Sequence, residues 1–558
     1  MLSARASASF RVVRKKPVLI GAAVILLAWL LALLSQLWPS LTLFDRLEAI
    51  SYDARVRMAV RHDSPFSSDL GLVYIGNDDL AQINSSYGYQ WPWPRQMYGR
   101  LLSELAAQGA KVVGFDILFC ELEPDSVKKA VKVAELLQRA RTLGQMHRGE
   151  GEAAQLADRA LEAAYEEILQ QSLETALVIG GRVVDSDDYF AEELARTGIG
   201  ILAAAGQEVA LRSAEGGLEP EAPPVWEALL PNDRFRTNAW MVGHILFDAD
   251  DDGVLRRARA FRDDPHHGRI WHMGILLAAR QLGLDMSKAQ VLPGQVILES
   301  PQGERRVIPV DRDGYFHINW SVRWNDPRLH RASFFSVLQE EIRRSSGTTN
   351  IPPVWRDKIV IVGSLGSGGN ISDLGATPLS EQDFLVSQHW NVANSILTNF
   401  FIRRSSFQTE SILLVLLGSL AGLLTWRLRP LWASCVLCGL LTAYFVLAFW
   451  LFVESRYWLP LVLPTVTVLL CHLSLLTYRV LVEQKERNRV RSVFAKVVAP
   501  NIVNELLKAD ISSLGGTRRN ISVYFADIRG FTQVTDESQV QAEEYVRTRG
   551  LSAAEAEE

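Results

Sequence analysis

Four long apolar runs interrupt an otherwise ordinary pattern of hydrophobic and polar positions. About 20 apolar residues in a helix cross a hydrocarbon layer of about 30 Å. The pattern therefore predicts four transmembrane helices, and the second run, which is short, needs Phe407 or a snorkelling Arg427 to complete its crossing. The four runs are Pro17–Trp38, Ser411–Trp426, Leu431–Val453 and Trp458–Val480.

The charges that flank these runs predict their orientation. The tail before the first run contains five basic residues and no acidic one, so the positive-inside rule places the amino terminus in the cytoplasm. Four crossings then return the carboxyl terminus to the cytoplasm, with Arg427 and Arg429 inside but Arg403 and Arg404 on the unexpected side. A cleaved signal peptide is the alternative for the first run, but the run is longer than a signal core and no small-x-small cleavage site follows it.

Short β-branched segments between the first and second runs predict an α/β domain outside the cytoplasm. Apolar residues at helical spacing in Arg95–Gln108 separate the first two segments, and a strand–helix–strand unit implies a mixed or parallel sheet with both faces covered. The Ala- and Glu-rich residues Asp125–Thr175 predict helices broken near Gly149. The predicted strands are Gly71–Gly76, Lys111–Phe119, Ala176–Val183 and Lys358–Gly363.

Composition narrows the classes of function. Hydrophobic residues make up 48% and charged residues 22% of the 558 residues, and the net charge is -5 with both signs interspersed. This balance gives no support to a nucleic-acid partner. Three of the four cysteines lie in the apolar runs, which excludes a disulfide framework and a four-cysteine metal site.

The segment Ile521–Thr532, ISVYFADIRGFT, is the most informative for chemistry. Alternating apolar residues predict a strand that ends at Asp527, after which the chain turns through Gly530. A carboxylate at a strand end beside a glycine turn suits a metal-nucleotide site. A turn-forming aspartate gives the same pattern, so spacing alone leaves both interpretations open.

The string FADIRGFT resembles the opening of the catalytic domain of class III adenylyl and guanylyl cyclases, and FAKVVAPNIVNELLK resembles the connector before that domain in bacterial members. The resemblance implies an α+β, ferredoxin-like domain that converts ATP into cyclic AMP and pyrophosphate as a homodimer. It also implies that Asp527 and the backbone carbonyl of Ile528 bind magnesium or manganese, while amides of Gly530, Phe531 and Thr532 meet the nucleotide phosphates. Because 26 residues follow Thr532, we expect the chain as given to lack most of the catalytic domain, and ATP and GTP are not distinguished.

A second resemblance covers the region between the first and second apolar runs, from about Leu43 to Asn399. It is to the type-two CHASE extracellular sensor domain of bacterial signalling proteins, and it implies an unknown extracytoplasmic ligand and a place in the bacterial inner membrane. The strings that carry it are LFDRLEAISYDARVRM, WPWPRQMYGRLLSELAAQGAKVVGFDILF, DDDGVLRRARAF, DGYFHINW and KIVIVGSLGSGGNISDLGATPL.

Four residues are candidates for a pocket in the sensor. Asp79 and Asp116 each end or interrupt a predicted strand and could face the carboxyl edge of a parallel sheet, and Trp91 and Trp93 could form an aromatic wall. Structural capping by the aspartates and a packed entry to the helix at Arg95 are the alternatives.

Gly418 and Gly422, at i and i+4 in the second apolar run, form a candidate helix face for dimerisation. In the soluble region, Asp248, Asp250 and Asp252 match the first half of a calcium loop, but the glutamate of position 12 is absent, which favours a turn.

The sequence thus predicts a membrane signalling protein with a sensor, spans, a connector and the start of a cyclase. The alternative is a non-catalytic membrane receptor or scaffold with a vestigial cyclase segment. The predicted organisation is a cytoplasmic tail (1–16), a span (17–38), the sensor (39–408), three spans (409–428, 431–453 and 457–480), a cytoplasmic connector (481–515) and an incomplete cyclase domain (516–558).

Overall fold

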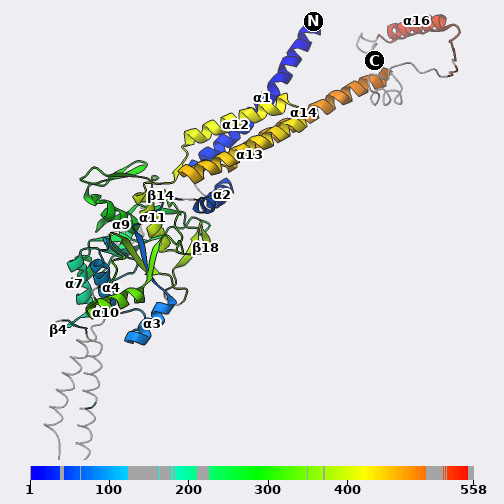
Figure 1. The fold of residues 1–558 in the computed structure, drawn as a ribbon. Coiled ribbons are helices and arrows are strands. Elements are labelled where there is room, and N and C mark those ends of the chain that lie inside the picture. The colour runs from blue at the N-terminus through cyan, green and yellow to red at the C-terminus, as the bar shows by residue number, and fades with distance from the viewer. Residues whose placement is uncertain are drawn as a thin grey trace, which may run out of the picture. The chain divides into compact units, whose positions relative to one another are not determined.

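The computed structural model describes residues 2–37, 43–62, 64–122, 163, 177–179, 182–209, 225–348, 350–368, 371–497, 520, 522 and 524–550. The chain forms two compact units, Met1–Tyr478 and Arg479–Glu558. The first unit contains an α/β domain and the long apolar helices (Figure 1).

The α/β domain is built around six parallel strands, which confirms the predicted sheet. In spatial order they are β15 (His330–Ser333), β1 (Leu70–Ile75), β16 (Ile359–Ser364), β2 (Val112–Phe115), β5 (Gly200–Val209) and β7 (Met241–His244). A seventh strand, β6 (Val225–Leu229), pairs antiparallel with the end of β5. Three of the predicted strands are here, and β16 lies between β1 and β2.

Alternating side chains of the sheet enter two separate cores. Val113 and Phe115 of β2 face a core built with α4 (Arg95–Ala107), α7 (Ser186–Thr197) and α10 (Phe334–Ser345). Val112 of β2 faces the opposite core, built with α9 (Met273–Leu282) and α11 (Ser387–Leu397). The period of two in a strand thus gives a three-layer α/β domain.

Local signals fix the ends of these helices. Asp185 begins α7 by accepting a hydrogen bond from the amide of Asp187, and Gly198 ends it with a φ of 60°. Glycine tolerates that left-handed conformation without strain. The remaining helices of the domain are α3 (Asn77–Tyr87), α8 (Asp233–Arg236) and the 3-10 turn η1 (Met286–Lys288).

Smaller antiparallel sheets complete the domain. They are β8 (Arg257–Arg259) with β14 (Tyr315–His317), β9 (Phe261–Asp264) with β10 (Gly268–Trp271), β11 (Gln290–Leu292) with β12 (Gln295–Glu299) and β13 (Arg305–Pro309), and β17 (Leu374–Thr377) with β18 (Ser380–Phe384). The predicted buried strand Ala176–Val183 is wrong in detail, because this segment contains a hairpin of β3 (Leu177–Ile179) and β4 (Arg182–Val184) outside the main sheet. The predicted helices in Asp125–Thr175 lie outside the described residues.

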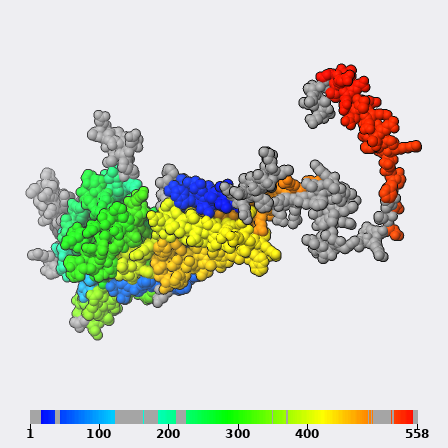
Figure 2. Space-filling model, turned by 90° about the horizontal axis from the view of Figure 1, so that it is seen from above, coloured from blue at the N-terminus to red at the C-terminus, as the bar shows by residue number. Residues whose placement is uncertain are grey.

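Four helices of the described chain are long and apolar enough to cross a membrane. The spans are Lys16–Ser35, Phe407–Arg427, Pro430–Ser455 and Val462–Val482, within α1 (Leu2–Leu37), α12 (Phe407–Arg427), α13 (Pro430–Ser455) and α14 (Val462–Val497). Phe407 belongs to α12, so the short second run reaches a spanning length. In Figure 2 the blue surface of α1 lies against the yellow surface of α12, with which it packs.

One further helix, α2 (Leu43–Val60), follows the first span, and a two-residue parallel pair joins β19 (Arg403–Arg404) to β20 (Tyr457–Trp458). All four cysteines are free thiols, in agreement with the sequence.

The second unit differs from its prediction. Residues 524–528 form no strand, and the chain turns at Gly530, with a φ of 76°, into α16 (Phe531–Arg549). A strand satisfies its backbone groups only by pairing with other strands, and Tyr524 and Phe525 are almost fully exposed. The turn at Gly530 is confirmed and the strand before it is not. Residues 481–497 of the predicted connector belong to α14, and residues 498–515 lie outside the described residues.

Candidate functional site

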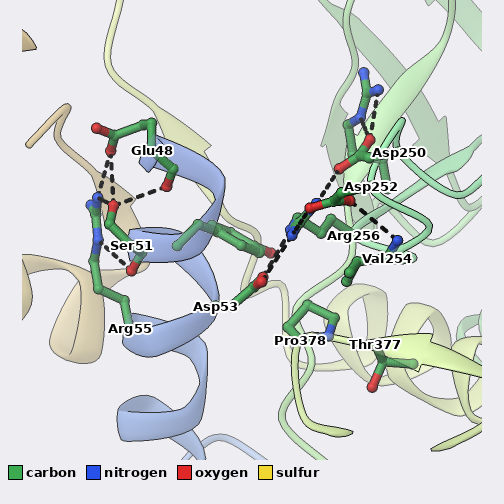
Figure 3. A network of polar contacts seen from close by, with 12 residues as sticks. Glu48, Ser51, Asp53, Arg55, Asp250, Asp252, Val254, Arg256, Thr377 and Pro378 are labelled. Atoms are coloured by element: carbon green, nitrogen blue, oxygen red, sulfur yellow. Dashed lines mark hydrogen bonds and ion pairs between the residues drawn. The ribbon is translucent and has the colours of Figure 1, made fainter. Parts of the chain in front are cut away.

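The junction between the α/β domain and the apolar helices gathers buried charge around α2. We use the name junction for Glu48, Asp53, Arg55, Arg256, Arg456 and residues 458–462. Glu48 and Arg55 lie on one side of α2, toward the start of α14, and Asp53 lies on the other side, toward Arg256 (Figure 3). The helix therefore presents charges in two directions.

Glu48 binds the beginning of α14. Its Oε2 accepts hydrogen bonds from the amides of Leu461, at 2.8 Å, and Val462, at 2.9 Å. Its Oε1 accepts one from Nε1 of Trp458, at 2.9 Å. The first amides of a helix have no partner within the helix, and a carboxylate there also meets the positive end of the helix dipole. Glu48 thus acts as an N-terminal cap supplied by another helix.

Arg55 compensates the charge of Glu48. Its Nη2 lies 2.6 Å from Oε1 of Glu48, and its Nη1 donates to the carbonyl of Leu459 at 2.8 Å. The Arg55 side chain is fully buried, and burial lowers the pKa of its guanidinium, although Glu48 opposes the shift. A buried arginine of this kind depends on its partner, because an unpaired buried charge is costly.

Asp53 forms the second connection, to the α/β domain. Both of its oxygens accept hydrogen bonds from Arg256, each at 2.8 Å. Arg256 also donates to Asp250 at 3.0 Å and to Asp252 at 2.7 Å. Burial opposes the charge of Arg256, but its hydrogen bonds to Asp53 and Asp252 outweigh this effect and raise the pKa of the guanidinium. This bidentate geometry holds α2 firmly to the loop that precedes β8.

The carboxylates of the loop Asp248–Gly253 therefore pair with arginines. The prediction that this loop forms a turn is confirmed. Asp248 pairs with Arg262 at 2.6 Å, while Asp250 and Asp252 pair with Arg256. Gly253 turns the chain with a φ of 80°.

Arg456 makes a third connection, from the end of α13. Its Nε donates to Asn319 at 2.9 Å and its Nη2 donates to Ser64 at 2.7 Å, both in the α/β domain. Beside it, the ring of Tyr52 lies 4.7 Å from that of Trp458 and 5.7 Å from that of Phe452. Aromatic packing and buried hydrogen bonds thus join the domain to both α13 and the start of α14.

The predicted sensor pocket is not assembled. Asp79 is buried as a cap, accepting hydrogen bonds from the amides of Gly76 and Phe335, each at 2.8 Å. Burial raises its pKa. The Trp93 ring is buried in the core beside α4, with Trp91 5.1 Å away. Asp116 leaves β2 on the opposite side and lies 3.5 Å from Nε2 of His389. The capping and packing alternatives describe Asp79, Trp91 and Trp93.

The predicted dimer face of α12 is occupied within the chain. A side chain at Gly418 would come within 2.7 Å of Ile25 in α1, and one at Gly422 within 3.6 Å of Leu475 in α14. These glycines permit close packing among the helices of one molecule.

The predicted magnesium or manganese site lies in an exposed turn before α16. Asp527 and Ile528 are exposed, and the Ile528 carbonyl accepts a hydrogen bond from the amide of Phe531 at 3.1 Å. Among the described residues no group of three or more His, Cys, Asp or Glu side chains is placed to hold a metal ion. Gly530, Phe531 and Thr532 do form the turn and first residues of α16.

Sequence reasoning missed the junction and a group of buried histidines at the carboxyl edge of the sheet. Glu48, Asp53 and Arg55 fall in a helix whose buried side contains charges directly after a span, which is the signal that could have identified the junction. Glu48 and Arg55 pair with each other, but their partners before α14 and the partner of Asp53 lie more than 200 positions away, so no local pattern names them.

Comparisons with known proteins give one match. The family model described as the CHASE2 domain matches residues 23–424, more than half of the chain. No curated protein and no solved structure matches.

Proposed function

The chain belongs to the CHASE2 family of extracellular sensor domains, and from this premise we propose that it is a transmembrane signalling protein whose sensor acts on the membrane helices through the junction. The four apolar helices lie in a lipid bilayer, and the sensor faces the outside of a bacterial inner membrane. The amino-terminal tail and the end of α14 face the cytoplasm.

The observation that carries this proposal is the double attachment of α2. One helix binds the sensor through Asp53 and Arg256 and binds the first amides of α14 through Glu48. A change in the loop around Arg256 therefore reaches α14 through a rigid element and buried bonds. Such a contact can transmit two discrete arrangements, because packed interfaces do not deform continuously.

Hydrogen exchange of the full chain in lipid nanodiscs tests this coupling. Asp53→Asn breaks the charged contact with Arg256 and leaves Glu48 intact. We expect faster exchange of the Leu461 and Val462 amides, which Asp53 does not touch, while the β16 amides stay protected. Asp263→Asn, which breaks the exposed Asp263–Arg269 pair, is the matched control and should leave α14 unchanged. Unchanged exchange at α14 in both variants would refute the coupling.

The output domain that we propose is a class III nucleotide cyclase acting on ATP in a homodimer with magnesium or manganese. Its support is the string FADIRGFT, in which Asp527 stands at the family's metal-binding position. The test is to read the gene beyond the codon for Glu558 and to assay the encoded protein for cyclic AMP and cyclic GMP. Cyclic AMP formation that Asp527→Asn abolishes supports the cyclase, whereas no cyclic nucleotide from either substrate leaves the receptor or scaffold as the function.

A further inference from the structure

Three fully buried histidines lie together at the carboxyl edge of the parallel sheet. We call His244, His272 and His389 the histidine cluster. The ring centroids of His244 and His272 are 5.1 Å apart, and those of His272 and His389 are 5.2 Å apart. They come from the last residue of β7, the N-cap of α9 and the first turn of α11. Three separate elements therefore meet through these rings.

The ring nitrogens of the cluster are poorly satisfied. Nδ1 of His272 accepts a hydrogen bond from the amide of Gly274 at 3.1 Å, which places the proton of the neutral ring on Nε2. Within the described residues, that Nε2 and both nitrogens of His244 and of His389 make no hydrogen bond of ordinary geometry. Buried polar atoms normally have partners. Weaker contacts join His244 to the Arg259 backbone and His272 to Gln388, and the ring nitrogens keep capacity for a proton.

Charges of both signs face the cluster. Arg262 and Arg259 lie on the His244 side, and Arg262 is paired with Asp248 at 2.6 Å. Burial and then Arg262 hold the pKa of His244 well below its ordinary value, and burial and then His244 do the same for the pKa of His272.

Carboxylates lie on the other side. Oδ2 of Asp116 is 3.5 Å from Nε2 of His389, and burial followed by Asp116 raises the pKa of Asp373 to about 6. Asp116 therefore lies beside His389, whereas the arginines face His244.

We propose that the histidine cluster is the ligand site of the sensor and that its ligand is the proton. This inference rests on the proposed sensor function and names what is sensed. A proton needs no cavity to reach fully buried rings, and among the described residues no three such side chains are placed for a metal ion. Histidine is the side chain whose ordinary pKa allows this exchange near neutral pH.

The closed cluster does not accommodate charge on His244 and His272. A proton on His272 puts a positive charge in a fully buried ring, and the His244 ring lies 5.1 Å away and faces Arg262. Protons on both rings put two like charges at this separation inside the domain, where they repel strongly. Acidification therefore moves α9 away from β7 and from α11, against which it packs.

That separation has a direct route to the membrane. A side chain at Gly274 of α9 would lie 2.6 Å from the carbonyl of His389, which shows that the two helices touch through their backbones. The chain leaving α11 places Arg403 and Arg404 in the pair with β20 and then enters α12. Movement of α11 thus acts on the same loop that Glu48 binds.

The sign of the pH effect follows from the two kinds of group. His244 and His272 have depressed pKa values, so opening the cluster takes up protons as the pH falls below about 6.5, the ordinary histidine value. Asp373 acts in the opposite direction, because its pKa in the closed form is about 6 and the closed form therefore takes up a proton on this carboxylate below about pH 6. The two histidines take up more protons on opening than the one aspartate takes up in the closed form. Acid therefore favours the open form, in which α9 and α11 are apart.

Hydrogen exchange of the full chain in lipid nanodiscs, corrected for intrinsic rates, tests the site. Between pH 7.5 and 5.5 we expect the amides of α9 and α11 to lose roughly tenfold protection, the effect of one proton over one pH unit below 6.5. His272→Gln keeps an acceptor for the amide of Gly274, cannot titrate, and should abolish most of this response, because Asp373 then offsets the one remaining histidine, His244. His266→Gln, at an exposed histidine of the same domain, should respond as the wild type does.

Asp116→Asn is a second variant in case His272→Gln fails to fold. It removes a charge that raises the pKa of Asp373, so the opposing proton uptake weakens and the loss of protection on acidification should become larger. The proton site would be overturned by any of three results: no pH response in the wild type, a full response in His272→Gln, or an unchanged response in Asp116→Asn.

The same data separate this site from the proposed function. A response at α9 and α11 without one at Leu461 and Val462 supports the proton site and contradicts coupling through the junction. Transmission of Asp53→Asn to α14 without any pH response leaves the coupling intact and overturns the proton site.

Discussion

Glu48 is a single residue that serves two helices. It caps α14 and neutralises Arg55, whose side chain has no exposure. Both roles depend on the negative charge, because the amide of glutamine keeps one acceptor but offers no ion pair. The residue is therefore expected to matter far more than a surface carboxylate.

We predict that Glu48→Gln lowers the free energy of unfolding by about 3–5 kcal/mol, the cost of leaving a buried arginine unpaired. Thermal unfolding of the full chain in nanodiscs measures the change. Asp263→Asn breaks a pair in which both side chains are exposed and should cost less than about 1 kcal/mol. Equal effects of the two variants would show that Arg55 finds another partner.

The ring of His317 lies 5.1 Å from that of Trp458 and gives the junction a pH dependence of its own. Burial, followed by Arg257, lowers the pKa of His317 to about 3, whereas the unfolded chain takes up this proton near pH 6.5. The folded domain should thus lose about 1.4 kcal/mol per pH unit as the pH falls from 6.5 toward 3. His317→Gln should flatten the unfolding free energy over this range by that slope, and an unchanged slope would show that His317 is solvated.

At the scale of elements, α2 couples two folded parts and α12 packs within one molecule. Close approach at Gly418 brings α12 against Ile25 of α1 and Thr467 of α14. The face of α12 that was predicted to contact a second molecule contacts α1 and α14 of the same molecule. The sequence around Gly418 does not show this, because the three helices come from distant parts of the chain.

Gly418→Ile is expected to destabilise the helices without changing the oligomeric state. Its side chain meets Ile25 at less than van der Waals distance, and overpacking of this kind costs about 1–3 kcal/mol. Gly439→Ile, where nothing lies within 4 Å, is the matched control. Thermal unfolding in detergent measures the stability, and light scattering in detergent measures the oligomeric state. A change from dimer to monomer without loss of stability would restore the dimer face.

The elements that could be predicted are those whose signal is local. The β-branched run of β16 predicts a strand, and the uncharged run in α1 predicts a membrane helix, each from consecutive residues alone. The Ala-rich strand β5 and the four-residue β7 do not, because their strand conformation depends on pairing within the sheet. The junction and the histidine cluster escaped for the same reason, since His244, His272 and His389 come together only when the layers are assembled.

At the scale of the whole membrane unit, contacts explain the two misplaced charges. Arg403 and Arg404 form β19, which pairs with β20 in the loop between α13 and α14, and Arg404 lies over the Trp458 ring at 5.3 Å. The start of α12 and the α13–α14 loop therefore share one end of the helices with the sensor. Because Arg403 and Arg404 are held by these contacts, they affect the orientation of the helices less than the basic residues at the other end do.

This arrangement predicts the sidedness of the chain in a cell. In a variant without native cysteines, His266→Cys in the exposed turn of the sensor should react with a membrane-impermeant maleimide in intact spheroplasts. Arg429→Cys, in the loop between α12 and α13 at the opposite end of the helices, should react only after permeabilisation. The positive-inside bias supplies the direction, and the alternation of the four helices supplies the opposite placement of the two sites. Reaction of both cysteines in intact spheroplasts would mean that α12 does not cross, and the reverse pattern would place the sensor in the cytoplasm, where protons and ligands from outside do not reach it.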